Sequence, residues 1–319
     1  MIRLLAASIL CATLVHAVPV PVIFDTDMGN DVDDVVALAA LHNLQDQDRC
    51  EILAVTVTKA HPLAGPFVER INTFKGHSKI PVGVIEKGPT PEEGLFLNLA
   101  KSDKSSAYPD AVSLLRKTLA AQPDNSVVII QTGFFTNLAR LLDSPPDEFS
   151  DLTGVELARK KVRLLSVMAG AFQPIGSDAS YREYNIAHDI ESAKTVAARW
   201  PSARLWSGFE IGKAVPYPHD VIERQFKKGD PLRDAYYLFN PPPHDRPNWD
   251  ATAVIAALMP NEAFFHYSPE GIVTVAQDGA TTFQELEGGP DRYLILDPKD
   301  APRVRETIVD LSLTPAPTD

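Results

Sequence analysis

Val22-Ile-Phe-Asp-Thr-Asp-Met-Gly-Asn-Asp-Val-Asp-Asp-Val-Val-Ala-Leu38 joins an apolar run to an apolar helical pattern through a turn rich in carboxylates. The five aspartates of this stretch are Asp25, Asp27, Asp31, Asp33 and Asp34. Carboxylates crowded around one turn repel one another, so a folded chain needs a cation among them. A hard divalent ion with oxygen ligands is the simplest candidate. The alternative, a solvated acidic loop that caps the next helix, accounts for one or two of these aspartates only.

Short apolar runs alternate with helical patterns outward from this stretch. Strands are predicted at 20–24, 51–58, 80–84, 126–131, 162–168 and 204–207, and the main helices at 34–44, 66–76, 110–121, 136–142, 189–199 and 250–259. Residues 272–277, 281–285 and 292–296 resemble a small antiparallel sheet, followed by a helix near 300–311. This order predicts an α/β fold: a mostly parallel central sheet covered by helices, with a small C-terminal antiparallel addition. No boundary divides residues 18–319, which we expect to form a single domain.

The composition and net charge of the chain argue against some classes of binding partner. The chain has 319 residues, 45% of them hydrophobic, and a net charge of −12. A strongly acidic chain is a poor partner for nucleic acid or an anionic membrane surface, so neither is expected. A small neutral or cationic ligand, or a metal ion, fits better.

The N-terminus has the pattern of a signal peptide spanning residues 1–17. Arg3 supplies the positive start, residues 4–15 are mostly apolar, and Val15-His-Ala17 resembles a cleavage site. The sequence therefore predicts a secreted or periplasmic protein. Cleavage would remove Cys11 and leave Cys50, so no internal disulfide is expected.

Polar residues follow several of the predicted strands. Asp25-Thr-Asp27, residues 58–61 and Gln131-Thr-Gly133 stand at three strand ends, and a later loop reaches Arg182-Glu-Tyr-Asn185. Because ligands of open parallel sheets bind outside the carboxyl ends of the strands, these groups should converge on one crevice. Such a crevice, rich in carboxylates and amides with few positive charges, suits a polyhydroxylated neutral substrate better than a phosphate.

Four segments, in order, resemble the inosine-uridine-preferring nucleoside hydrolase family. They are Asp25-Thr-Asp27-Met-Gly29 with Asp33-Asp34, then Gln131-Thr-Gly-Phe-Phe-Thr-Asn-Leu138, Glu183-Tyr-Asn185 and Trp249-Asp250. The resemblance covers residues 22 to about 260 and implies a nucleoside hydrolase-like, Rossmann-related fold. It also implies Ca²⁺-dependent hydrolysis of ribonucleosides to free base and ribose.

The resemblance further implies a role for individual residues. Asp27, Asp34, Asp250 and the main-chain carbonyl of Thr132 would bind the Ca²⁺. Asp27 would also be the general base that activates a water on the ion. The residues implied to bind substrate are Asp33, Glu183 and Asn185, on the ribose hydroxyls, and Trp249, which could stack on the base.

The chain departs from the family pattern at four places, one of which is Ser177, where the family has an Asn six residues before the Glu. The first motif has two extra residues, and the continuation of the helix assigns the Asp-Asp pair to Asp33-Asp34, which leaves Asp31 without a role. Trp249 stands where many members have a histidine that protonates the leaving base, so it either stacks on the base or only packs. His61 follows a strand where the family often has Asn; it is either a substitute acid or a surface residue. Asp25 is expected to be structural.

Two other functions stay open from the sequence. One is a protein of the same fold that binds nucleoside or ribose without turnover. The other is a phosphatase of the haloacid-dehalogenase type, which also places Asp-x-Asp after a strand but does not call for Asp33-Asp34 or Glu183-Tyr-Asn185. The preferred base is open as well, and the resemblance allows a homo-oligomer, either a dimer or a tetramer.

Overall fold

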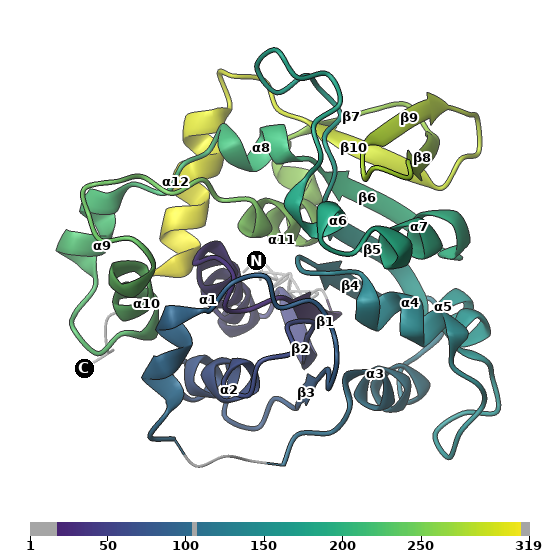
Figure 1. The fold of residues 1–319 in the computed structure, drawn as a ribbon, viewed down its shortest axis with the longest axis horizontal. Coiled ribbons are helices and arrows are strands. Elements are labelled where there is room, and N and C mark those ends of the chain that lie inside the picture. Colours follow the sequence, from purple (N-terminus) through teal and green to yellow (C-terminus); the bar gives the residue numbers. More distant parts are fainter. Residues whose placement is uncertain (1–17, 104–106, 314–319) are drawn as a thin grey trace, which may run out of the picture.

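The computed structural model describes residues 18–103 and 107–313. The predicted signal peptide lies outside the described residues. Ten strands form one sheet (Figure 1), in the order β3-β2-β1-β4-β5-β6-β10-β8-β9, with β7 paired to β10. The strands are β1 (Val20–Thr26), β2 (Cys50–Val57), β3 (Val82–Val84), β4 (Val127–Gln131), β5 (Val162–Met168), β6 (Ala203–Ser207), β7 (His266–Tyr267), β8 (Gly271–Val275), β9 (Thr281–Glu285) and β10 (Asp291–Ile295).

The strands from β3 to β6 run parallel, because each is followed by a crossover that contains a helix. In β1, Val22 and Phe24 belong to one hydrophobic core and Ile23 belongs to the other, on the opposite face. All three side chains are fully buried. A strand covered on both faces needs an unbroken apolar run, which is why β1 has no polar alternation. The predicted mostly parallel sheet is confirmed.

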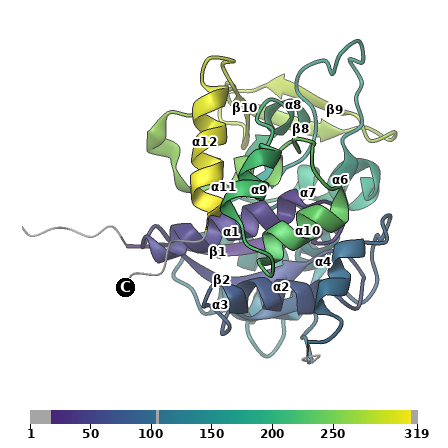
Figure 2. The same ribbon diagram turned by 90° about the vertical axis from the view of Figure 1, so that its left-hand side faces the viewer.

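Helices cover both faces of this sheet. The helices α1, α2, α10, α11 and α12 contribute to the core on one face, and α3, α4, α5 and α7 to the core on the other (Figures 1 and 2). The helices of the first face are α1 (Asp33–Asp46), α2 (Ala64–Phe74), α10 (Pro231–Phe239), α11 (Asp250–Leu258) and α12 (Ala301–Ser312). Those of the second face are α3 (Ala111–Ala120), α4 (Thr136–Asp143), α5 (Gly154–Lys161) and α7 (Ile190–Arg199). The remaining helical segments are η1 (Leu95–Ala100), α6 (Tyr184–Ala187), α8 (Phe209–Lys213), α9 (His219–Gln225) and η2 (Pro260–Glu262).

The C-terminal strands continue the central sheet. The predicted antiparallel addition is present, since β8 pairs antiparallel with both β9 and β10. The other edge of β10 pairs with β6, and this pairing is parallel. A buried ion pair joins these two strands: the Arg204 guanidinium on β6 donates to both carboxylate oxygens of Asp291 on β10, at 2.5 and 2.8 Å. Trp206 Nε1 and the Val273 amide donate to the same carboxylate, at 2.7 and 2.8 Å.

Asp291→Ala should therefore lower the free energy of unfolding by about 3–5 kcal/mol, the usual cost of leaving a buried charge unpaired. Arg204 would lose its partner, since both side chains are at most 3% exposed. Urea unfolding followed by circular dichroism measures the change. Arg292→Ala is the matched control, because Arg292 pairs with Glu270 on the exposed surface. Equal stabilities of the two variants would contradict the prediction.

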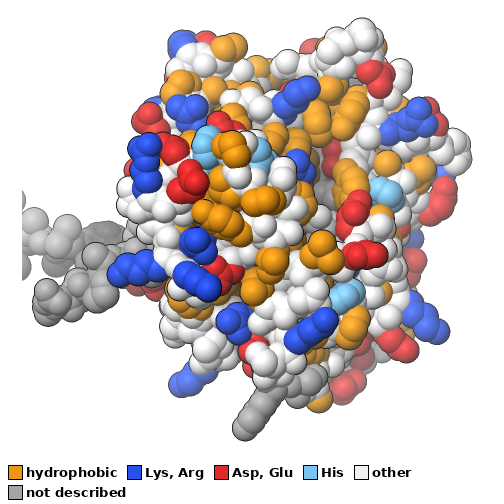
Figure 3. All heavy atoms as spheres, turned by 60° about the vertical axis from the view of Figure 1, so that its left-hand side comes forward, with side chains coloured by type: hydrophobic (Ala, Val, Ile, Leu, Met, Phe, Trp, Pro, Cys, Tyr) orange, Lys and Arg blue, Asp and Glu red, His pale blue; other side chains and the backbone are white. Residues whose placement is uncertain are grey.

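The face formed by α2, η1 and α10 carries hydrophobic side chains among charged ones (Figure 3). Phe74, Leu95 and Leu238 are the large exposed hydrophobic residues of these three elements. Within the described residues, the helices are all too short or too polar to cross a membrane.

Candidate active site

A cavity of about 430 Å³ opens where β1, β4 and β5 end. Asp27 and Thr132 follow β1 and β4 directly, and Met168 is the last residue of β5. All eight residues that the resemblance assigns to the metal, the ribose or the base line this cavity. The lining residues are Asp27, Asn30, Asp31, Asp33, Asp34, Glu92, Thr132, Met168, Tyr181, Glu183, Tyr184, Asn185, Phe209, Phe239, Arg246, Trp249 and Asp250.

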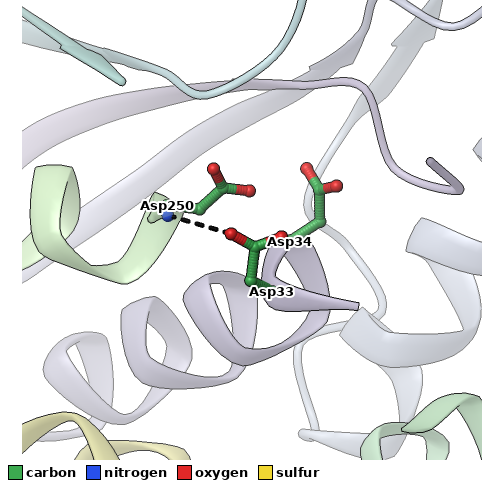
Figure 4. A group of neighbouring side chains, drawn as sticks. All are labelled: Asp33, Asp34 and Asp250. Carbon is green, nitrogen blue, oxygen red and sulfur yellow. Dashed lines mark hydrogen bonds between the residues drawn. The ribbon is translucent and has the colours of Figure 1, made fainter. Parts of the chain in front are cut away.

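Three carboxylates meet at one end of the cavity. Asp33 and Asp34 form the first turn of α1, and Asp250 begins α11, which packs beside α1 (Figure 4). One oxygen from each carboxylate lies within 4.8 Å of the others. The two helix N-termini favour negative charge here. Asp33 also joins the helices, because it accepts hydrogen bonds from the main-chain amides of Trp249 and Asp250, at 3.1 and 3.3 Å.

These buried carboxylates hold their protons more tightly than exposed ones. Burial, and then the negative charge of Asp31, raises the pKa of Asp33 well above its ordinary value. Burial and the charges of Asp27 and Asp33 do the same to the pKa of Asp34. Burial and the charges of Asp33 and Asp34 raise the pKa of Asp250. A cation at this end of the cavity would remove the mutual repulsion that the three groups share.

Asp27 lies beside this cluster and is held by its own loop. Asn30 Nδ2 donates to Asp27 Oδ2 at 2.6 Å, and Lys59 Nζ donates to Asn30 Oδ1 and to the Glu92 carbonyl oxygen. Lys59 is buried, so its ammonium group is fixed behind Asn30. Burial raises the pKa of Asp27 to about 6 against the lowering by Asn30 and Lys59. The loop therefore orients the carboxylate toward the cavity.

Asp25 lies outside the lining residues, in agreement with the structural role expected for it. Its Oδ1 accepts hydrogen bonds from Thr56 Oγ1 and Asn137 Nδ2, at 2.6 and 2.8 Å. Asp25 thus ties β1 to β2 and to α4. Burial raises its pKa to about 7.

Glu183 and Asn185 also line the cavity. Glu183 caps α6 by accepting the main-chain amides of Asn185 and Ile186, at 2.9 and 3.2 Å. Burial raises its pKa to about 7. Asn185 Nδ2 donates to the carbonyl oxygens of Thr132 and Met168, at 3.0 and 3.1 Å. This contact fixes the Thr132 carbonyl at the cavity wall.

Aromatic rings form one wall of the cavity, beside the carboxylate end. Trp249 Nε1 donates to the Phe209 carbonyl oxygen at 2.8 Å, and their ring centroids are stacked 5.2 Å apart. Tyr181 continues the wall, with its ring centroid 4.4 Å from that of Phe209. Such a wall offers a flat planar ligand a surface to stack on.

Asp31, which had no role assigned from the sequence, forms an ion pair with Arg246. The Arg246 Nε donates to both Asp31 oxygens, at 3.0 and 3.1 Å, and Nη2 donates to Oδ2. Arg246 and Asn30 also line the cavity and were not predicted to do so from the sequence. Their positions in the sequence indicate a place near the site, because Asn30 lies inside the first motif and Arg246 lies three positions before Trp249. His61 does not line the cavity; its Nδ1 accepts the Leu63 amide at 3.1 Å.

The carboxylate end of the cavity fits a hard divalent cation. Its donors are all oxygens, and two buried atoms there, Asp34 Oδ2 and Thr132 Oγ1, have no hydrogen-bond partner among the described residues. The resemblance assigns Asp33 to the ribose, but in the structure its carboxylate lies in the same cluster as those of Asp34 and Asp250. The assignment of Asp27, Asp34, Asp250 and the Thr132 carbonyl as metal ligands stays a prediction.

Comparison with solved structures shows the same fold in several proteins. A plant nucleoside hydrolase, the PpNRh1 enzyme, matches with 23% identity and a TM-score of 0.71, over 93% of this chain and 100% of that one. The inosine-uridine preferring nucleoside hydrolase of Bacillus anthracis matches with 21% identity and a TM-score of 0.68, over 92% and 98%. The type III effector protein XopQ, complexed with adenosine diphosphate ribose, matches with 14% identity and a TM-score of 0.69, over 93% and 95%.

The sequence comparisons identify the family. The search of curated proteins found no match. The sequence profile described as inosine-uridine preferring nucleoside hydrolase matches residues 22–306, which contain all the motifs above and every lining residue of the cavity. The family is metal-dependent and acts on nucleosides, in keeping with the buried aspartate cluster. The chain therefore belongs to the inosine-uridine preferring nucleoside hydrolase family and is a hydrolase of N-glycosyl compounds.

Proposed function

We propose that this protein hydrolyses the N-glycosidic bond of ribonucleosides to free base and ribose in a Ca²⁺-dependent reaction. Asp27, Asp34, Asp250 and the Thr132 carbonyl would hold the ion. When bound, the ion supplies positive charge that acidifies nearby water and orients ribose hydroxyls. The observation that carries the proposal is the convergence of four buried aspartates with Glu183 and Asn185 around one cavity.

The residues divide the work by position. Asn30 occupies Asp27 Oδ2, which leaves Oδ1 to take the proton from the attacking water. Glu183 and Asp33 face the cavity with carboxylates that accept hydrogen bonds from ribose hydroxyls. The surrounding negative charge stabilises the oxocarbenium-like sugar that forms as the bond to the base breaks.

A nucleoside panel tests the proposal directly. Purified protein would be incubated with inosine, uridine, adenosine and cytidine, and with a phosphate ester, while reducing sugar and phosphate are measured. Ribose release that a Ca²⁺ chelator abolishes and added Ca²⁺ restores is the expected result. Ribose release that persists in chelator would contradict the metal dependence.

A role in binding without turnover is the alternative. It is supported by Trp249 in the place of the family histidine, and by the fold shared with XopQ, whose structure contains adenosine diphosphate ribose. Nucleoside binding measured by calorimetry, with no ribose released over a long incubation, would favour this alternative.

Trp249→Ala should lower kcat/KM for inosine by about 10-fold or more, because base–aromatic stacking contributes about 1–3 kcal/mol per base. Steady-state kinetics on the nucleoside panel measure the loss. Trp249→Phe is the matched control, since it keeps a ring against Phe209. Unchanged turnover of every nucleoside by the Ala variant would assign Trp249 to packing alone.

We also propose that the protein is exported, secreted or periplasmic, after cleavage following Ala17. The proposal rests on the apolar, positively flanked N-terminal sequence. N-terminal sequencing of the exported protein tests it, and Met1 found on that protein would rule out cleavage.

A further inference from the structure

Arg246 is the one positively charged residue among the described residues that line the cavity. Two of its three nitrogens, Nε and Nη2, donate to Asp31. The remaining nitrogen, Nη1, has no hydrogen-bond partner in the part of the chain that the structure describes. The side chain is 30% exposed, so this edge of the guanidinium is accessible to a ligand.

The guanidinium lies between the carboxylate end and the aromatic wall. Its central carbon is 4.9 Å from the ring centroid of Phe239 and 5.2 Å from that of Trp249. Asp33 accepts the main-chain amide of Trp249, so the carboxylate end begins directly beside this ring. A ribose held by the carboxylates and a base stacked on Trp249 would place their connecting bond next to Arg246.

Breaking that bond puts an electron pair on the base nitrogen. The tyrosines among the described lining residues, Tyr181 and Tyr184, are poor proton donors for it, because burial raises the pKa of both hydroxyls. No histidine is among the described lining residues. The indole N–H of Trp249 already donates to the Phe209 carbonyl. The negative charge that develops on the base therefore needs a fixed positive group nearby. Electrostatic stabilisation of this kind is the largest single contribution to catalysis in many enzymes.

We propose that Arg246 stabilises the negative charge on the departing base, and that Asp31 is the residue that positions its guanidinium. The inference rests on the proposed hydrolysis. In this step the water oxygen bonds to C1′ and its proton passes to Asp27. The C1′–N bond breaks, its electron pair stays on the base, and the base leaves as an anion that takes a proton from solvent.

A selectivity follows from this assignment. A base that spreads negative charge onto a carbonyl group makes a better anion than one that carries an amino group in its place. Loss of Arg246 should therefore cost more on hypoxanthine and uracil ribosides than on those of adenine and cytosine. Because Nε and Nη2 of Arg246 donate to Asp31, Nη1 is left to donate a hydrogen bond to an acceptor atom of the base.

Two substrates with different leaving groups test the role. Inosine needs help to release its base, whereas p-nitrophenyl β-D-ribofuranoside releases a stable nitrophenolate unaided. Arg246→Met should lower kcat for inosine by about 100-fold, as loss of one charge-stabilising donor does, and change kcat for the nitrophenyl riboside only a few-fold. Arg246→Lys should recover part of the loss. Equal losses on both substrates, or no loss on either, would overturn the proposal.

Two further variants separate this role from folding. The double variant Asp31→Asn with Arg246→Met leaves no unpaired carboxylate and should show the same substrate-dependent loss. Arg292→Met, which breaks a surface ion pair with Glu270, should keep wild-type kcat on both substrates. If the wild-type protein hydrolyses neither substrate, the proposed function fails and this role with it; hydrolysis of both with equal losses in the variant defeats the Arg246 role alone.

Discussion

Asp27→Asn should lower kcat for inosine by about 1,000-fold or more, the size expected when a general base is lost. The substitution keeps the shape of the side chain and its contact with Asn30, which binds Asp27 Oδ2. It removes the charge at Oδ1 that would take the proton from water. Initial rates of ribose release at saturating inosine and Ca²⁺ measure the effect.

The control for this variant is Ca²⁺ binding, because Asp27 is also proposed as a ligand. Calorimetric titration should find Ca²⁺ bound to Asp27→Asn at raised concentration, with catalysis still lost at saturation. Full activity of Asp27→Asn once Ca²⁺ saturates it would show that Asp27 holds the ion and is not the base.

Removing metal should make stability depend on pH between pH 5 and 8. Burial is the main cause that raises the pKa of Asp25 and Glu183 to about 7 and the pKa of Asp27 to about 6. Their pKa values in the unfolded chain are lower, so the stability that these groups contribute is full below about pH 4 and is lost as pH rises through about 6–7. The Tm of metal-free protein should therefore fall from pH 5 to pH 8.

Added Ca²⁺ should reverse this loss. An ion at 100 times its Kd stabilises the folded state by about 2.7 kcal/mol, which raises Tm by about 5 °C in a chain of this size. The rise should be larger at pH 8, where the carboxylates are ionised, than at pH 5. Differential scanning calorimetry in chelator and in Ca²⁺ measures both effects.

Asp34→Asn provides the matched control for the calorimetry. It removes one of the repelling charges, so metal-free Tm at pH 8 should rise while the response to Ca²⁺ falls. A metal-free Tm that is constant from pH 5 to 8, with no response to Ca²⁺, would be incompatible with a cation site at this cluster.

The sheet and the ends of its strands could be predicted because they depend on local pattern. A short, unbroken apolar run such as that of β1 is typical of a strand that is buried on both faces of a sheet. The polar residues after β1 and β4 then share one edge of the sheet. The start of α1 at Asp33 likewise agrees with the helical spacing of its apolar residues.

Other features depend on parts of the chain that meet only in the folded state. The ion pair between Asp31 and Arg246 joins residues 215 positions apart, and no periodicity marks such a partner. The parallel pairing of β10 with β6 likewise brings together Asp291 and Arg204, which lie 87 positions apart in the sequence. Helix α5 was missed for a different reason. Its only strong local signal is the capping box of Thr153 and Glu156, because the helix is short and carries few apolar residues.

The meeting of α1 and α11 has a consequence for folding kinetics. Asp33 and Asp250 are 217 positions apart, so bringing their carboxylates together closes a loop of most of the chain, a step that we expect late in folding. We therefore expect the transition state for folding to lack this binding site, so that an ion does not assist the early steps. Ca²⁺ should therefore leave the folding rate nearly unchanged and lower the unfolding rate. The Ca²⁺-bound protein would then stay folded for longer but would not fold faster.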